Sequence, residues 1–184
     1  MPERPAPDRE PGLIRRLVDG HRPADPREAA SKRTFLDELG RLPRPCDRHA
    51  DPVHVTASAI VVGPRGTVLH VHRRLGRWMQ PGGHLDEGEP PGHAALREGT
   101  EETGLPLEHP AGGPRMIHVD VHEAAERHVH LDLRYLVLAP DLDPAPPAGE
   151  SQQVRWFSWD EAEKVADEAL VGALRAAREA GRRT

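Results

Sequence analysis

Four glutamates in the stretch 83–105 have residue types and spacing that suit metal chemistry. Glu98, Glu101 and Glu102 stand at i, i+3 and i+4, so in a helix their carboxylates point from one face. Like charges at this spacing destabilise a helix by about 0.2–0.5 kcal/mol per pair, and a bound cation removes that repulsion. Hard divalent ions such as Mg²⁺ take oxygen ligands, usually a few carboxylates plus substrate phosphates. The spacing therefore indicates either a metal site or a solvated acidic face.

The residues around these glutamates resemble the Nudix box. Its pattern is Gly, five residues, Glu, seven residues, Arg-Glu, an aliphatic residue, any residue, Glu-Glu, any residue, Gly and an aliphatic residue. The matching positions, all in register, are Gly83, Glu89, Arg97, Glu98, Glu101, Glu102, Gly104 and Leu105. The aliphatic position after Arg-Glu holds Gly99 instead. A helical glycine costs about 1 kcal/mol relative to Ala, so we expect Gly99 to let the helix lie close to a neighbouring element.

The resemblance implies a Mg²⁺ or Mn²⁺ site. Glu98, Glu101 and Glu102 would be the metal-facing carboxylates, the backbone carbonyl of Gly82 would join them, and one carboxylate would deprotonate the attacking water. Arg97 would orient the site by pairing with Glu89, although an ordinary i,i+4 pair with Glu101 competes with that interpretation. Family members often use one further acidic residue from a later loop. The candidates here are Glu150, ranked first, then Glu123, Glu126 and Asp132.

The resemblance also implies an activity, a divalent-metal-dependent hydrolase that cleaves a diphosphate (pyrophosphate) linkage in a nucleoside diphosphate derivative or nucleotide. A non-catalytic Nudix-fold module that binds a nucleotide metabolite is the main alternative. A prenyl diphosphate isomerase on a related scaffold needs a cysteine in the active cleft. The single cysteine, Cys46, precedes the predicted core, which argues against that activity. Nothing in the sequence selects one substrate.

Twelve histidines are the second unusual feature. In the segments 118–122 and 128–134, histidines, aspartates and Arg134 alternate with apolar residues. If both segments are strands and they pair, their polar side chains gather on one face. Three interpretations stay open: His128, His130 and Arg134 bind substrate, the face is solvated, or the histidines form a separate transition-metal site, since imidazole suits Zn²⁺ and related ions.

Three further residues near the box are candidates for substrate contact. Arg73 follows the second expected strand and could hold a phosphate, although an exposed turn residue is equally consistent with its position. Trp78 could stack on a base or lie buried beneath the box loop. His84 directly follows Gly83, within reach of the expected metal site, or stabilises the loop through a hydrogen bond.

Composition restricts the classes of partner. The 184 residues carry a net charge of −5, from 25 basic and 30 acidic residues, which gives no electrostatic case for binding duplex nucleic acid. No apolar run is long enough to span a membrane, and the first residues lack the apolar core of a signal peptide. Cys46 cannot form an internal disulfide and fits a reducing compartment. We expect a cytoplasmic protein that acts on a small nucleotide or pyrophosphate substrate.

Residues 1–51 form a leader that precedes the catalytic domain. Its first eleven residues are rich in proline and charge and are expected to be disordered. A short helix is expected at 13–18. A second starts with Asp25 as N-cap, Pro26 and a capping Glu28, and ends at Gly40. Its apolar stripe must be buried against the catalytic domain, against a second subunit in a homodimer, or as a lid.

Residues 52–184 are expected to form the Nudix hydrolase domain. Strands are predicted at 53–62, 67–72, 116–121, 128–138 and 153–158. The box helix follows Pro90 and Pro91, and a final helix begins after the capping box Ser158 to Glu161. This order supports only an α/β or α+β fold. The resemblance sharpens that prediction to a Nudix-type α/β/α sandwich with a mixed sheet, plus a short N-terminal helical extension.

Overall fold

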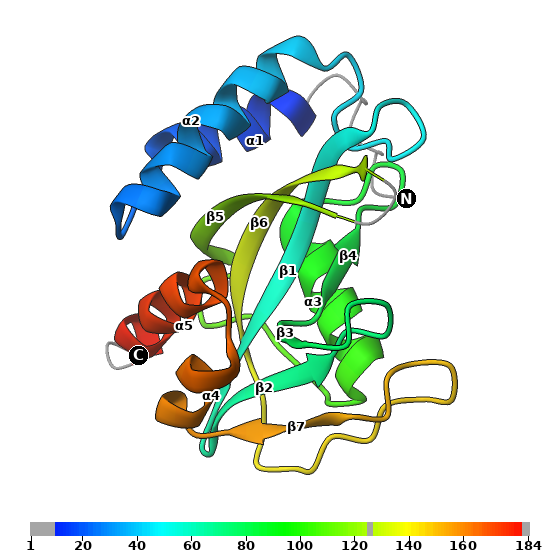
Figure 1. The fold of residues 1–184 in the computed structure, drawn as a ribbon, viewed down its shortest axis with the longest axis vertical. Coiled ribbons are helices and arrows are strands. Elements are labelled where there is room, and N and C mark those ends of the chain that lie inside the picture. The colour runs from blue at the N-terminus through cyan, green and yellow to red at the C-terminus, as the bar shows by residue number, and fades with distance from the viewer. Residues whose placement is uncertain (1–9, 125–126, 182–184) are drawn as a thin grey trace.

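A computed structural model describes residues 10–124 and 127–181 (Figure 1). Its helices are α1 (Glu10–Gly20), α2 (Pro26–Arg41), α3 (Pro91–Thr103), α4 (Trp159–Val165) and α5 (Glu168–Gly181). Its strands are β1 (Val53–Gly63), β2 (Gly66–Val71), β3 (Trp78–Met79), β4 (Gly82–His84), β5 (Arg115–Glu123), β6 (Val129–Leu138) and β7 (Val154–Phe157). The five long predicted strands and the box helix are confirmed.

The strands form one mixed seven-stranded sheet in the order β3-β2-β1-β6-β5, with β4 paired to β1 and β7 paired to β2. β1 and β6 run parallel over ten residue pairs, and the other pairs are antiparallel. Side chains alternate between the two faces of a strand. Val55, Ala57 and Ala59 of β1 therefore point to one face, while His54, Thr56 and Ser58 point to the other.

Helices cover both faces of this sheet, as the predicted sandwich requires. Figure 1 shows α3 on one side of β1 and α4 with α5 on the other. A Cβ atom on Gly99 of α3 would lie 2.9 Å from the Cβ of Ala59 and 2.9 Å from a methyl of Leu107. Gly99 therefore departs from the box pattern because α3 packs too closely on β1 for a side chain, as its small size predicts.

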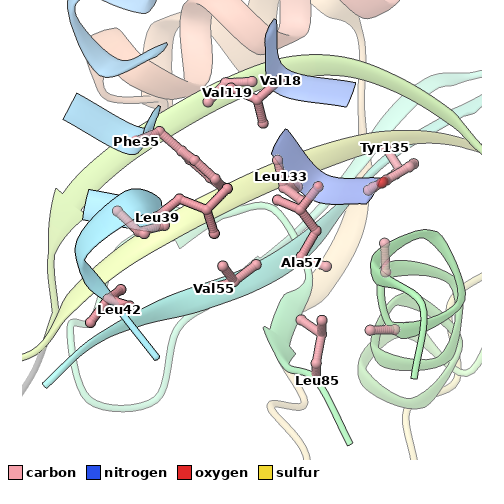
Figure 2. Close-up of a cluster of buried hydrophobic side chains, with 14 residues drawn as sticks. Val18, Phe35, Leu39, Leu42, Val55, Ala57, Leu85, Val119, Leu133 and Tyr135 are labelled. Atoms are coloured by element: carbon pink, nitrogen blue, oxygen red, sulfur yellow. The ribbon is translucent and has the colours of Figure 1, made fainter. Parts of the chain in front are cut away.

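The leader helices pack on the catalytic domain of the same chain. Phe35 and Leu39 of α2 are buried in a cluster with Val55 of β1 and Leu131 of β6 (Figure 2). Asp25 caps α2 as predicted, because its carboxylate accepts from the backbone N–H of Glu28 at 2.8 Å. Glu28 itself differs from the prediction: its side chain is buried and accepts from the backbone N–H groups of Ala24 and Val119.

The end of the chain also differs from the prediction of one final helix. The capping box of Ser158 and Glu161 is present and starts α4. That helix ends at Ala166, whose backbone is extended, and the carboxylate of Asp167 then accepts from the backbone N–H of Leu170 at 2.9 Å. A second N-cap therefore starts α5. None of the helices in residues 10–124 and 127–181 is long and apolar enough to cross a membrane.

Candidate active site

A cavity of about 770 Å³ opens beside the box helix. Glu98 and Glu102 of α3 line one side, and Thr56 and Ser58 of β1 lie at its base. Much of the remaining lining is basic or imidazole-bearing, and these residues are Arg48, His49, His70, His72, Arg73, Arg74, Arg77, His84, His122, His128 and His130. The cavity thus places carboxylates opposite a surface that suits an anion.

Glu102 is the most strongly perturbed carboxylate of the cavity. One of its oxygens accepts from the backbone N–H of Gly82 at 2.8 Å and lies 3.7 Å from Nε2 of His70. Burial is the largest cause that raises the pKa of Glu102, to about 8, and repulsion from Glu98, Glu150 and Glu101 adds to it. A carboxylate held this way gains from a nearby cation.

Glu98 lies against the backbone of Gly83. A Cβ atom on Gly83 would be 2.5 Å from the Glu98 carboxylate carbon, so the first box glycine makes room for that carboxylate. Burial raises the pKa of Glu98, and the guanidinium of Arg97 opposes the shift. Glu101 is different, because its side chain is 54% exposed and is not among the residues that line the cavity.

Arg97 connects the box loop to α3. It donates to both oxygens of Glu89, at 2.9 and 2.8 Å, to Glu98 at 2.9 Å and to the backbone carbonyl of His84 at 3.0 Å. Its contact with Glu101 is longer, at 3.4 Å. The hydrogen bonds that Arg97 donates to Glu89 are the main reason that the pKa of Arg97 is raised. This geometry supports the interpretation of Arg97 as an orienting residue, with the i,i+4 pair as a secondary contact.

Gly104 ends α3 in the left-handed conformation, with a φ of 67°. A Cβ there would lie 2.0 Å from the carbonyl oxygen of Ala145. The last box glycine therefore serves both the helix end and the close approach of the loop that carries Glu150. Glu150 lines the cavity, as do Glu123 and Asp132, whereas Glu126 lies outside the described residues.

The predicted substrate contacts fall into two groups. Arg73, His84, His128 and His130 line the cavity, and Arg73 also donates to the backbone carbonyl of Gly149. Trp78 is not among the lining residues. Its ring packs edge-on against Phe157, with centroids 4.8 Å apart, and the guanidinium of Arg155 lies 5.4 Å above it. Trp78 therefore packs against side chains of β7 and is not placed to stack on a base in the cavity.

Arg134 also lies away from the cavity lining, contrary to its predicted role. β5 and β6 pair as expected, with Asp120 opposite Asp132 and His122 opposite His130. Arg134 is only 3% exposed, and it donates to Asp120, to Asp132 and to the backbone carbonyl of Ala169. Each of the three guanidinium nitrogens donates to a buried protein acceptor, so Arg134 is better described as a structural residue that holds the two aspartates.

Several residues of the cavity region were not predicted from the sequence. His70 and Ser58 line it, and His54 lies beneath it, 0% exposed. The alternation of His54, Thr56 and Ser58 within a β-rich run was the available signal, because it places three polar groups on one face. The run was interpreted only as a strand, since β-branched and apolar residues dominate it.

Comparison with known proteins agrees with this geometry. The NUDIX domain family matches residues 52–176. A bis(5'-nucleosyl)-tetraphosphatase (asymmetrical) of Caenorhabditis elegans is 32% identical over 101 residues, covering 53% of this chain and 70% of that protein. A NUDIX-family hydrolase from Clostridium perfringens superposes with a TM-score of 0.56 at 28% identity, covering 69% of this chain and 95% of the other.

A second solved structure extends the likeness to the leader. A UDP-X diphosphatase structure covers 96% of this chain and 95% of its own, with a TM-score of 0.53 and 16% identity. That identity shows only the fold, but the alignment reaches beyond the domain that the family match covers. Family match, relatives and box geometry agree: the chain belongs to the NUDIX family and is a Nudix pyrophosphohydrolase.

Proposed function

We propose that this chain hydrolyses a diphosphate linkage in a nucleotide-derived substrate with the help of Mg²⁺ or Mn²⁺. The observation that carries the proposal is the meeting of Glu98 and Glu102 in one cavity. Both carboxylates are largely buried, which raises the cost of charging each of them, and the charge of Glu98 adds to that cost at Glu102. A divalent cation between them offsets that cost, because opposite charge favours the ionised carboxylate.

The donor set fits a hard cation. Glu98, Glu102, Glu101 at the rim and the backbone carbonyl of Gly82 would all supply oxygen, which is the ligand that Mg²⁺ and Mn²⁺ prefer. When bound, such an ion neutralises phosphate charge and polarises the phosphoryl oxygen. The protein contributes positioning, since Arg97 fixes Glu98 and the loop carbonyl of His84 together. A carboxylate of this cluster, or Glu150 across the cavity, takes the proton of the attacking water.

The opposite wall indicates a substrate with several phosphates. Arg48, Arg73, Arg74 and Arg77 all line the cavity, and guanidinium groups bind phosphate oxygens in pairs. Aromatic residues make up only 3% of the chain, so base stacking contributes less to recognition than charge does. We propose nucleoside diphosphate derivatives and dinucleoside polyphosphates as the substrate class, the latter supported by the tetraphosphatase relative.

A phosphate-release screen tests the activity. The purified chain would meet nucleoside triphosphates, nucleotide sugars, ADP-ribose, dinucleoside polyphosphates, NADH and coenzyme A, with Mg²⁺ and separately with Mn²⁺. A coupled phosphatase reveals nucleoside monophosphate products. We expect turnover of at least one polyphosphate, lost in Glu102→Gln and retained in Glu87→Gln, an exposed box glutamate away from the cavity.

Metal removal tests the cofactor separately. We expect EDTA to abolish turnover and added Mg²⁺ or Mn²⁺ to restore it, because the carboxylates need a cation to hold phosphate in the same cavity. Full activity in excess EDTA would exclude the proposed mechanism. If no compound of the panel is turned over but a nucleotide raises the melting temperature, this chain has a binding function instead.

A further inference from the structure

We propose that His54, His84 and His130 form a second metal site, separate from the carboxylates, for a borderline transition-metal cation such as Zn²⁺. This site would be built from imidazole nitrogen, which suits Zn²⁺ and its neighbours, whereas the box carboxylates suit Mg²⁺ and Mn²⁺. The inference does not depend on the proposed hydrolysis.

The three histidines come from three strands that lie side by side. His54 on β1 is in register with His130 on β6, and β4 pairs with β1 so that His84 lies opposite Thr56. The ring centroids are 5.1 Å apart for His54 and His84, 5.1 Å for His54 and His130, and 5.4 Å for His84 and His130. The rings therefore form a nearly equilateral triangle whose base is fixed by sheet hydrogen bonds.

One nitrogen from each ring can be chosen so that all three lie within 4.8 Å of one another. Three nitrogens bound to Zn²⁺ at about 2.0–2.1 Å in tetrahedral geometry lie roughly 3.4 Å apart. The difference is roughly 1.4 Å per nitrogen pair, and rotation of the side chains on strands that are already paired can close it. The backbone is thus already arranged for three imidazole ligands.

His54 supplies the strongest evidence for a ligand at this place. Its side chain is fully buried, and its Nε2 atom has no hydrogen-bond partner among the described residues. Its Nδ1 atom lies 3.2 Å from the carbonyl oxygen of Asp51. A carbonyl only accepts, so Nδ1 carries the proton and Nε2 presents a lone pair. Metal-binding histidines are commonly oriented this way, with the second ring N–H donated to a carbonyl or carboxylate.

Leaving a buried acceptor unpaired costs free energy, so this arrangement is unfavourable unless something binds Nε2. A cation at the centre of the triangle would satisfy Nε2 of His54.

The surroundings can accommodate a positive ion. Nδ1 of His84 lies 3.5 Å from Arg48, at the limit of a hydrogen bond, and because that contact is exposed the arginine can move into solvent. On the other side, the carboxylate of Asp132 favours positive charge at His130. The ring of His122 lies 5.3 Å from His130, and its Nδ1 contacts Asp120 at 3.0 Å. Asp132 and Asp120 thus lie on this side of the cluster, both also paired with Arg134.

The site would be open on one side. His84 and His130 line the substrate cavity, while His54 lies beneath them. Zinc sites with three protein ligands keep a fourth position for water or substrate. In this chain that position faces the cavity, where it would take water or an anionic oxygen of a bound phosphate.

Cobalt binding to the full, untagged chain tests the proposal. Co²⁺ reports four-coordinate geometry by intense visible absorption, and excess Mg²⁺ keeps the carboxylates occupied. We expect one Co²⁺ per chain with that absorption, displaced by Zn²⁺. The variants His84→Gln and His130→Gln should each weaken Co²⁺ affinity at least about 100-fold, since loss of even an outer partner of a ligand costs 10–100-fold.

Two control variants separate the sites. His93→Gln changes an exposed histidine on α3 outside the cluster, and Glu102→Gln changes the carboxylate site. Both should retain the intense Co²⁺ absorption. Circular dichroism and melting temperature would show that each variant is folded. A third ligand variant, His54→Asn, changes a fully buried residue and could fail to fold. In that case the Co²⁺ affinities of His84→Gln and His130→Gln alone test the proposal. Three results would overturn the proposal. They are weak Co²⁺ absorption in the wild type, absorption that is lost only in Glu102→Gln, and undiminished Co²⁺ binding in His84→Gln and His130→Gln.

Discussion

The two walls of the cavity respond to burial in opposite ways. On the α3 wall, burial raises the pKa values of Glu98 and Glu102, and the carboxylates repel one another. On the wall formed by β1, β4 and β6, burial lowers the pKa values of His54, His84 and His130, and the imidazoles disfavour each other's protonation. Desolvation disfavours the charged form on both walls.

That difference determines which cation each wall suits. A buried carboxylate pair is left with unfavourable negative charge and gains from a hard divalent ion. A buried group of neutral imidazoles has lone pairs and no charge, so it gains from a softer ion that binds nitrogen. Two polar clusters of similar burial can therefore have separate ligands within one cavity. Each prediction below changes one wall, or a group outside both.

The largest effect is expected on the carboxylate wall. Glu102→Gln should lower kcat about 10³-fold, because it removes a charged oxygen from a preorganised electrostatic site. The amide can still accept from the N–H of Gly82, so the fold should persist. The metal-free variant should also melt at a higher temperature, since a buried repelling charge has been removed. Steady-state kinetics and differential scanning calorimetry on the same preparations measure both effects.

Glu101→Gln changes an exposed carboxylate at the rim of that wall, and its effects on turnover and melting temperature can be compared with those of Glu102→Gln. Its carboxylate is 54% exposed, so we expect a loss of turnover of orders of magnitude if it binds metal, but no gain in melting temperature. Near-native activity in either glutamine variant would show that the metal assignment is wrong.

A second prediction concerns a buried histidine outside the cavity lining. His118 is 1% exposed, and burial, with repulsion from Arg134, lowers its pKa to about 4. The unfolded chain binds a proton at this residue near pH 6.5, whereas the folded chain binds it only near pH 4. Stability is therefore lost as pH falls through that range, by about 1.4 kcal/mol per pH unit and up to about 3 kcal/mol in all.

Urea unfolding at several pH values between 7 and 4 measures this loss. In His118→Gln the free energy of unfolding should depend less steeply on pH, because the chain takes up about one proton fewer when it unfolds. His93→Gln, which changes an exposed histidine, should follow the wild type. Parallel curves for His118→Gln and the wild type would contradict the assignment of the buried neutral form.

Arg97→Lys should have the next largest effect. Lysine keeps the charge but cannot donate to both oxygens of Glu89 together with Glu98 and the carbonyl of His84. Orienting partners of metal ligands contribute about 10–100-fold to metal affinity. We therefore expect the Mg²⁺ concentration for half-maximal activity to rise by that factor, with kcat at saturating Mg²⁺ lowered less. A fall in kcat alone, at unchanged Mg²⁺ dependence, would contradict the orienting role.

Most of the fold was predictable because its signals are local. The N-cap at Asp25, the capping box at Ser158 and the β-rich runs each act within a few residues, and the box fixed α3. β3 and β4 were not predicted, since strands of two and three residues have no periodicity to detect. The break between α4 and α5 was missed because the apolar stripe continues across Asp167.

The residues of the site could be predicted only where they lie within one short segment of the sequence. Gly83, Glu89, Arg97 and Glu98 lie close in sequence, so their contacts follow from a short motif. Arg134 and Trp78 were assigned to substrate because their residue types suit it, but their surroundings come from α5 and β7, which local pattern cannot place. His54 depends on strand pairing that joins residues 54, 84 and 130, and no local signal records that proximity.

The smallest effect is expected at the rim of the histidine wall. His128 lines the cavity, and its ring lies 5.2 Å from that of His54, yet it belongs to no set of three nitrogens within reach of one ion among the described residues. His128→Ala should therefore raise KM only a few-fold, about 1 kcal/mol for one hydrogen bond, and leave Co²⁺ binding intact. His128→Ala with His130→Ala should raise KM further and abolish Co²⁺ binding. Unchanged KM in both variants would favour a solvated face over substrate contact. Loss of Co²⁺ binding in the single variant His128→Ala would instead place this residue among the metal ligands, so that the histidine site would extend to the rim of the cavity.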